Sequence, residues 1–191
     1  MKLAAATSKA LVGVLAFLVV FRIVFLAGGQ ARLYSAGSTS IEDSRPHSSC
    51  SAAEYRQFDF WLGDWDAFDI GGTTPVARVR VDGLLEGCVL RENYEGVDGH
   101  KGQSLSIYDS SRRVWHQSWV TNRGELLTIE GKFQGGEMVL SGADRTAEGK
   151  PRLVRGIWKA EGGGVRETAV TSTDGGKTWT PWFDLVFRPH K

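Results

Sequence analysis

The chain has few cysteines, histidines and prolines: its 191 residues include two, four and five of them, respectively. The cysteines and histidines show no spacing typical of metal ligands, so no metal site is expected. Basic residues are not in excess either, because 23 lysines and arginines face 22 aspartates and glutamates. Three of the basic residues lie within residues 1–31, so the remainder has 20 basic and 22 acidic residues. This balance argues against a nucleic-acid partner, which would require a basic surface.

Several signatures of catalysis and of other fold classes are also missing. The glycine run 162–164 joins two predicted strands and no helix follows it, so it is not a phosphate-binding loop. No G-x-S-x-G nucleophile motif occurs. No segment of the body has a helical apolar stripe, and strands do not alternate with helices as in a parallel sheet.

Residues 1–31 are predicted to be a signal peptide or an N-terminal membrane anchor. Two lysines and no acid precede an apolar run over residues 10–21, as in signal peptides. Arg22 interrupts the run, which then continues to residue 27, and 10–27 is near the lower limit for a membrane span. Cleavage gives a secreted or periplasmic protein. Without it, the protein stays attached to the membrane through residues 10–27 only.

Residues 32–54 are rich in serine and lack apolar periodicity, which predicts a tether between the leader and a folded domain over 55–191. The two cysteines, Cys50 and Cys88, lie at the end of this tether and inside an apolar run. An exported protein with an even number of cysteines favours their pairing. We therefore expect a disulfide that joins the tether to the domain.

The domain is predicted to be all-β, because short alternating apolar runs are separated by turns rich in glycine, aspartate and asparagine. Ten such antiparallel strands suit an up-and-down barrel, and a two-sheet sandwich is the alternative. The predicted strands cover residues 57–69, 74–83, 86–94, 101–109, 113–121, 125–134, 136–143, 152–160, 164–172 and 179–188.

The strand over 113–121 shows which side chains should face the interior. Trp115, Gln117 and Trp119 lie on one face, and His116 lies on the other. Burying the face with two indoles removes the larger apolar area from water. Gln117 then points inward with them and needs a hydrogen-bond partner, which is a side chain, a water or a ligand.

The segment from Phe58 to Asp66 is the most distinctive of the chain. Its Gly63-x-Trp65 resembles the opening of the calycins, the lipocalin and fatty-acid-binding superfamily, in which the tryptophan closes the barrel. The fuller set resembles a family of small secreted bacterial proteins of unknown function with an F-D-F-W-x-G-x-W-D opening. This match spans roughly 55 to 188 and implies a calycin-like barrel but no activity. It rests on the opening and on Gly87-Cys88, Tyr108-Asp109, Trp115-x-Gln117-x-Trp119-Val120, Met138-x-Leu140-x-Gly142, Trp158, Asp174 to Trp179 and Phe183-Asp184.

A second motif, from Ser172 to Trp179, looks like the Asp-box hairpin of sialidases and other propellers. The box recurs in those folds and occurs once here, which predicts a structural turn. Asp174 should cap the loop amides, Gly176 should permit the reversal, and Trp179 should pack beneath.

Nitrobindin-type haem proteins are similar calycin barrels whose histidine ligand projects inward from the last strand. Residues 182–188 contain no histidine, and His190 follows Pro189 near the chain end. His116 lies opposite the row of Trp115. Haem is therefore not expected, nor is any other cofactor.

Arg155 and Glu167 lie on neighbouring predicted strands, where either an exposed pair or an inward pair is possible. The other carboxylates are expected to form an outward-facing charged row. Acid–base chemistry would need one of the titratable candidates inside the barrel. These candidates are Asp59, Glu92, His116, Glu167 and Asp184.

The leading functional hypothesis is extracytoplasmic binding of a small, mainly apolar ligand in the barrel. The expected ligand contacts are Trp61, Trp115, Gln117, Trp119, Arg155 and Trp158, and the structural residues are Gly63, Trp65, Asp174, Gly176 and Trp179. Trp61, like Trp65, is alternatively a barrel-closing residue. The two other hypotheses are an isomerase or cyclase that uses the same cavity, and an envelope structural module with a filled core.

Overall fold

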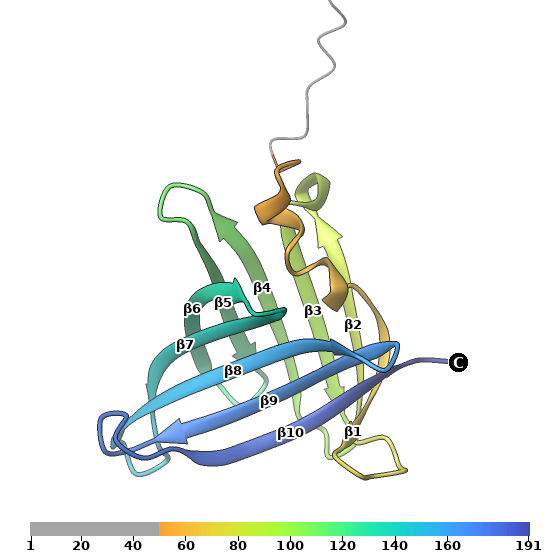
Figure 1. Cartoon of the computed structure of the whole chain (residues 1–191). Coiled ribbons are helices and arrows are strands. Elements are labelled where there is room, and N and C mark those ends of the chain that lie inside the picture. Colours follow the sequence, from red (N-terminus) through yellow and green to blue (C-terminus); the bar gives the residue numbers. More distant parts are fainter. Residues whose placement is uncertain (1–49) are drawn as a thin grey trace, which may run out of the picture. The chain divides into compact units, whose positions relative to one another are not determined.

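The computed structural model describes residues 50–191. They form a closed antiparallel barrel in which each strand pairs with its neighbours in sequence and β1 also pairs with β10 (Figure 1). This is the up-and-down, calycin-like barrel of ten strands that the sequence predicted. The strands are β1 (Gly63–Asp69), β2 (Ala77–Leu84), β3 (Val89–Gly96), β4 (Lys101–Asp109), β5 (Val114–Thr121), β6 (Leu126–Gln134), β7 (Glu137–Arg145), β8 (Pro151–Glu161), β9 (Gly164–Ser172) and β10 (Thr180–Pro189).

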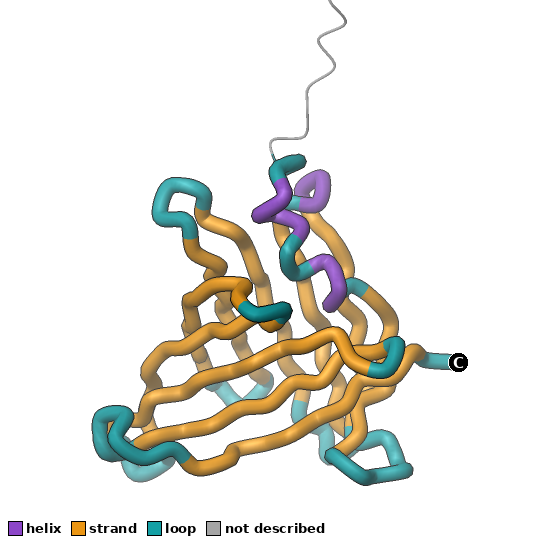
Figure 2. The backbone as a smooth tube through the Cα atoms, viewed as in Figure 1, coloured by secondary structure: helices purple, strands orange, loops and turns teal. Residues whose placement is uncertain are grey.

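Three short 3-10 helices lie at one end of the barrel (Figure 2). They are η1 (Ala53–Arg56), η2 (Asp59–Trp61) and η3 (Leu85–Gly87). The prediction of a strand over all of 57–69 is therefore wrong in its first part. Phe58 and Trp61, three residues apart, lie on the same side of a 3-10 turn and are buried in the core, which an extended chain could not achieve. The segment serves as a plug for the barrel end.

The predicted leader, residues 1–31, and nearly all of the predicted tether, residues 32–54, lie outside the described residues. Helix η1 begins slightly before residue 55, where the domain was expected to start. None of the helices within residues 50–191 is long and apolar enough to cross a membrane.

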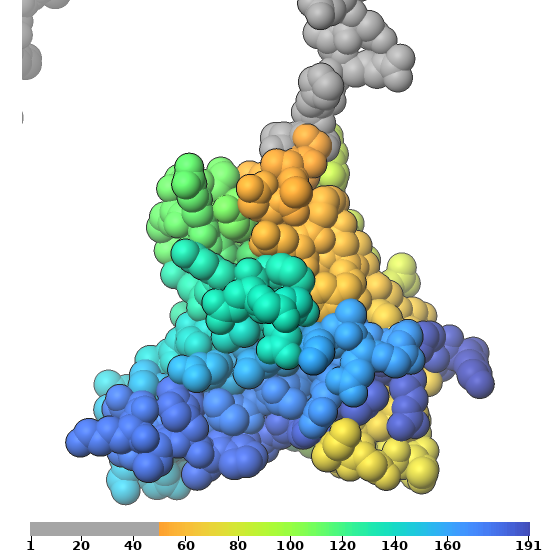
Figure 3. Space-filling view, in the orientation of Figure 1, coloured from red at the N-terminus to blue at the C-terminus, as the bar shows by residue number. Residues whose placement is uncertain are grey.

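A disulfide between Cys50 and Cys88 confirms the predicted pairing. It joins the first described residue to the turn between β2 and β3, and Arg56 of η1 also donates a hydrogen bond to the Gly87 carbonyl of that turn. Tyr55 packs edge-on against Tyr108 of β4, with ring centroids 5.3 Å apart. The space-filling view shows this segment seated on the barrel end beside the β4–β5 hairpin (Figure 3).

Trp65 shows why the Gly-x-Trp spacing is needed. Its indole lies across Gly63, where a Cβ atom would be 2.3 Å from Trp65 Cζ2. It also stacks on Trp61, with centroids 6.1 Å apart, and its Nε1 donates to the Trp61 carbonyl. The two indoles close the barrel next to the plug.

The turn between β9 and β10 has the predicted Asp-box geometry. Asp174 accepts hydrogen bonds from the backbone amides of Lys177 and Thr178, at 2.9 and 3.0 Å. The Trp179 Nε1 donates to the Gly176 carbonyl, and Gly176 has a φ of 87°, which suits glycine. The Asp174 carboxylate and the Trp179 indole therefore both stabilise the turn.

Candidate functional site

An open cavity of about 1070 Å³ extends into the barrel. Antiparallel pairing puts η2 and the turns after β2, β4, β6 and β8 at one end and the turns after β1, β3, β5, β7 and β9 at the other. The cavity reaches the second end, because Val76, Val97 and Arg123 are among its lining residues. It is therefore closed by the plug and extends toward the opposite hairpin loops.

The cavity wall is mainly apolar and aromatic. Leu127 and Ile129 of β6 and Leu185 and Phe187 of β10 all line the cavity. With their neighbours they form a surface suited to an apolar ligand. The other apolar or aromatic lining residues are Val76, Tyr94, Val97, Trp119, Leu126, Trp158, Trp182 and Phe183.

Trp61 and Trp115 lie in the packed core and are not among the residues that line the cavity. Phe58 contacts Trp115 edge-on at 5.6 Å, and the Trp115 Nε1 donates to Gln57 Oε1 at 3.2 Å. Trp61 packs edge-on against Phe187 at 4.5 Å. The structure therefore places both indoles in the floor, beneath the cavity.

Gln117, Trp119 and Trp158, by contrast, line the cavity. The Gln117 side chain is buried and donates a hydrogen bond to Ser106 Oγ at 3.1 Å, so its partner is a side chain. Trp119 lies against Gly102, where a Cβ atom would be 2.2 Å from its ring, and meets Tyr94 edge-on. The missing side chain at Gly102 leaves room for this indole in the wall.

Glu92 of β3 is the most buried acid in the described chain, with 8% of its surface exposed. It follows Leu90 and precedes Tyr94 at two-residue intervals, so all three point inward. Ser104 on the neighbouring strand donates a hydrogen bond to it at 2.8 Å. Burial raises the pKa of Glu92 to about 7, although the Ser104 hydrogen bond opposes the shift.

Glu167 of β9 also lines the cavity, and its partly exposed surface faces that space. Burial and, secondarily, the charge of Glu92 raise its pKa well above the ordinary value. Its register partner on β8 is Trp158, whose indole N–H opposes the shift. The Trp158 Nε1 nevertheless lacks a partner at ordinary hydrogen-bond geometry among the described residues.

Neither carboxyl group has a cationic partner. Within residues 50–191, the ion pairs include neither Glu92 nor Glu167. Two carboxyl groups close together in a poorly solvated space resist being charged at the same time, so the charge of one favours the protonated form of the other. The cavity thus combines apolar walls with a pair of carboxyl groups that have no cationic partner.

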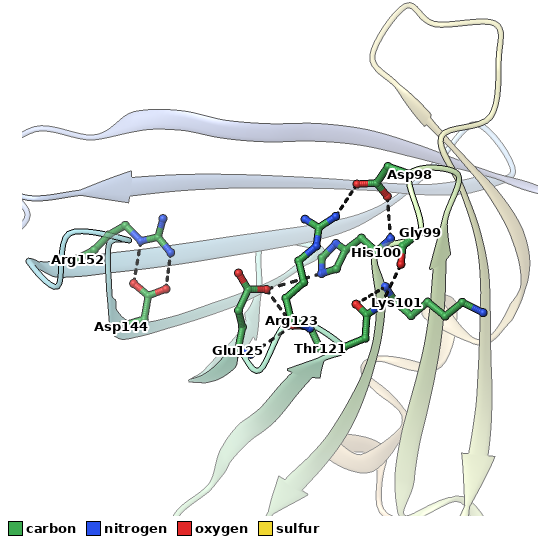
Figure 4. Close-up of polar contacts among 10 residues, drawn as sticks. Asp98, Gly99, His100, Lys101, Thr121, Arg123, Glu125, Asp144 and Arg152 are labelled. Atoms are coloured by element: carbon green, nitrogen blue, oxygen red, sulfur yellow. Dashed lines mark hydrogen bonds and ion pairs between the residues drawn. The ribbon is translucent and has the colours of Figure 1, made fainter.

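The loops at the open end are linked by exposed polar contacts (Figure 4). Arg123 pairs with Asp98 at 2.8 Å, and His100 lies 3.7 Å from Glu125, so the β3–β4 and β5–β6 loops hold each other. Asp144 and Arg152 form a separate pair on β7 and β8. Exposed ion pairs contribute little to stability, and hydrogen bonds of Asn122 with Gly99 and Lys101 join the same two loops.

The prediction that Arg155 contacts a ligand in the cavity is wrong, because its side chain lies on the outer face of the barrel. Arg155 pairs in register with Val170 and stacks on the Trp179 ring at 4.3 Å, on the outer face. It therefore makes neither an exposed nor an inward pair with Glu167. The alternation Val154, Gly156, Trp158 carries the inward positions of β8, which leaves Arg155 outside.

The remaining titratable candidates do not reach the cavity. His116 is on the outer face, as predicted, and contacts Glu130 and Ser118 at 2.8 Å each. Asp184 pairs with Arg166, and His190 lies 2.9 Å from Asp66. Asp59, on η2, is 3.5 Å from Arg56, and burial raises its pKa.

Sequence reasoning missed Tyr94, which lines the cavity, and the buried serines at positions 104 and 106, which hydrogen-bond the lining residues Glu92 and Gln117. The alternation along β3 and β4 was a signal for them, because Gly102, Ser104 and Ser106 share the inward face of β4. Within the described part of the chain there is no group of three or more side chains placed to hold a metal ion.

A comparison with models of protein families found no match. A search of curated proteins found no significant similarity either.

Proposed function

We propose that this protein binds a small, mainly apolar molecule in the barrel, outside the cytoplasm. The observation that carries the proposal is the cavity of about 1070 Å³ with walls of leucine, isoleucine, phenylalanine and tryptophan. Binding pockets for small molecules typically measure a few hundred to about 1000 Å³ and are lined in this way. A structural module with a filled core has no use for such a space.

The disulfide supports the location. Structural disulfides persist in oxidising compartments and are rare in the cytosol, and Cys50–Cys88 fixes the start of the folded unit. The predicted leader would provide the export.

Fluorescence of the neutral apolar dye Nile red tests binding. It should brighten on entering the cavity, and a Leu127→Trp variant, which narrows the cavity, should reduce the dye's affinity at least tenfold. Thr128→Trp is the matched control, since Thr128 is the next residue on β6 and is exposed on the outer face. Equal dye binding by all three proteins would contradict the proposal.

A second candidate function, proton-transfer isomerisation of a bound apolar substrate, is favoured by Glu92 and Glu167. A general base works best with a pKa near the ambient pH, and burial places Glu92 at about 7. A carboxylate would remove a proton from the carbon next to a carbonyl, and the carboxylic acid so formed would return it at the γ-carbon. Conversion of 3-cyclohexen-1-one to the conjugated enone, lost in Glu92→Gln, is the test; a rate equal to buffer alone would exclude this chemistry for that substrate.

A further inference from the structure

The cavity lining has an excess of acid. Six carboxylates belong to it, against two arginines, Arg123 and Arg145. Asp98 is paired with Arg123 and Asp144 with Arg152, so the other four carboxylates carry the excess, and Arg145 donates to the Gly149 carbonyl at the loop. An excess of one sign of charge in a cavity attracts ligands of the opposite sign. The carboxylates are Asp69, Glu92, Asp98, Glu125, Asp144 and Glu167.

The two deepest of these carboxylates also lack compensation. Glu92 has only the Ser104 hydroxyl as a donor, and Glu167 faces Trp158 without a hydrogen bond of ordinary geometry. Among the described residues no lysine or arginine reaches either group, as the cavity's two arginines are engaged elsewhere. Buried charges are normally paired, so the site is short of one cation.

A second, independent observation points to a ligand in the same place. The Trp158 side chain is 3% exposed, lines the cavity and has an Nε1–H without a hydrogen-bond partner. A buried donor left unsatisfied is costly, and such groups usually mark a missing water, ion or ligand. A cation bound beside Glu167 would hold this carboxylate in its charged form, and the charged carboxylate is then the stronger acceptor that the indole N–H needs.

We propose that the ligand is an organic amine with an apolar body, held with its ammonium group between the carboxylates of Glu92 and Glu167. This inference rests on the proposed function and adds the chemical class of its ligand. The ammonium supplies the donors that the two carboxylates lack. The apolar body lies against Leu127, Ile129 and Leu185.

The aromatic wall fits the same ligand. Tyr94 and Trp119 stand edge to face, 6.0 Å apart, on the lining of the cavity, and a cation near an aromatic face gains further attraction. A fatty acid would instead bring a third carboxyl group to the acid pair. A neutral alcohol would hydrogen-bond there but would leave the charge uncompensated.

Binding of an ammonium group should release protons, because it favours the charged form of both carboxyls. The other titratable groups that face this space are Asp69 of β1, Tyr94 of β3, and Asp98, His100, Arg123, Glu125, Asp144 and Arg145 nearer the mouth. They are the groups whose titration must be separated from that of the pair.

Isothermal titration calorimetry of the purified protein at pH 8 tests the inference. The probes share one body and differ in the head group: 4-phenylbutylamine, 4-phenyl-1-butanol and 4-phenylbutanoate. We expect the amine to bind at least tenfold more tightly than the alcohol, and the acid to bind most weakly. Glu92→Gln and Glu167→Gln should each weaken amine binding at least tenfold and alcohol binding less than threefold.

Glu95→Gln is the matched control, since Glu95 lies on the outer face of β3 beside Lys101 and should bind the amine as the parent does. The inference is overturned if the alcohol or the acid binds as tightly as the amine, or if both glutamine variants lose amine and alcohol affinity equally. If Nile red still binds in that case, the proposed function survives without this ligand class. If neither the dye nor any of the three probes binds, the proposed function fails as well.

Discussion

Glu92 on β3 and Glu167 on β9 come close enough in the barrel interior for the charge of one to raise the pKa of the other. They are on strands four positions apart around the barrel, so only closure of the sheet brings them together. Their shared space is apolar, and neither has a cationic partner among the described residues. This acid pair is the chemical centre of the site.

The pair should make stability depend on pH. The pKa of Glu92 is about 7 in the folded protein and about 4.5 when unfolded, so the folded state holds the proton more tightly. The contribution of Glu92 to stability is then fully present below about pH 4.5 and is lost as the pH rises to about 7, by on the order of 3 kcal/mol. Glu92→Gln should remove most of this loss and melt higher than the parent at pH 8. Thermal melts of both proteins at pH 4.5 and pH 8 measure this difference. If the parent melted at the same temperature as the variant at pH 8, or at a higher one, the prediction that a charged Glu92 destabilises the fold would be wrong.

Trp65→Ala should mainly reduce stability, by about 3 to 5 kcal/mol, because the indole fills the closed end against Gly63 and Trp61. Urea unfolding measures the change. His116→Ala, on the outer face, should stay within about 0.5 kcal/mol of the parent. Equal losses in the two variants would show that the closed end does not depend on this indole.

Trp119→Ala should act on binding rather than on folding. The indole is half-buried and lines the cavity beside Tyr94, so its loss removes ligand contact while the floor stays packed. We expect at least a tenfold weaker affinity for Nile red, with a melting temperature close to that of the parent. If the affinity for the dye were unchanged, the dye would bind at a place that Trp119 of β5 does not line.

Reducing Cys50–Cys88 should destabilise the domain. The bond spans 38 positions, and closing a loop of that size in the unfolded chain is worth on the order of 3 to 4 kcal/mol. The double variant Cys50→Ser with Cys88→Ser should show the same loss without reductant. Denaturant unfolding curves with and without reductant give the loss in the free energy of unfolding. If reductant also lowered the stability of the double variant, the loss could not be assigned to the disulfide.

Asp174→Ala should loosen the β9–β10 turn, since its carboxylate accepts from Ser172, Lys177 and Thr178. Amide hydrogen exchange over residues 173–179 should accelerate strongly. Asp174→Asn keeps one acceptor oxygen and should show a smaller effect. Exchange equal to the parent in the alanine variant would mean that the glycines alone define the turn.

Most of the barrel could be predicted because strand alternation and glycine turns are local signals. The predicted run over 101–109 coincides with β4, and that over 164–172 coincides with β9. The segment at Phe58 and Trp61 was mistaken for a strand because its helical form depends on burial in the barrel end, which is a tertiary effect. The disulfide was accessible from cysteine number and position alone.

The site was less predictable. Gln117 and Trp119 were placed on the inward face by alternation, and Trp158 was also expected to contact the ligand; all three line the cavity. Arg155 was expected there too, but the inward positions of Val154 and Gly156 place it outside. Glu92 and Glu167 could be named only as candidates, because nothing in the chain says that residues on β3 and β9 share one space until the barrel closes. Which indoles form the floor and which line the cavity likewise depends on the plug.

Carbon-13 NMR of the glutamate carboxyl carbons, followed from pH 3 to pH 10, shows whether Glu92 and Glu167 form a poorly solvated acid pair in the cavity. Glu92→Gln and Glu167→Gln variants assign the two signals. We predict that Glu92 titrates with a pKa of about 7 and Glu167 well above its ordinary value, and that 4-phenylbutylamine lowers both. If both carboxyl groups titrated near pH 4.5, with or without the amine, they would be well solvated, and the proposed acid pair would not exist.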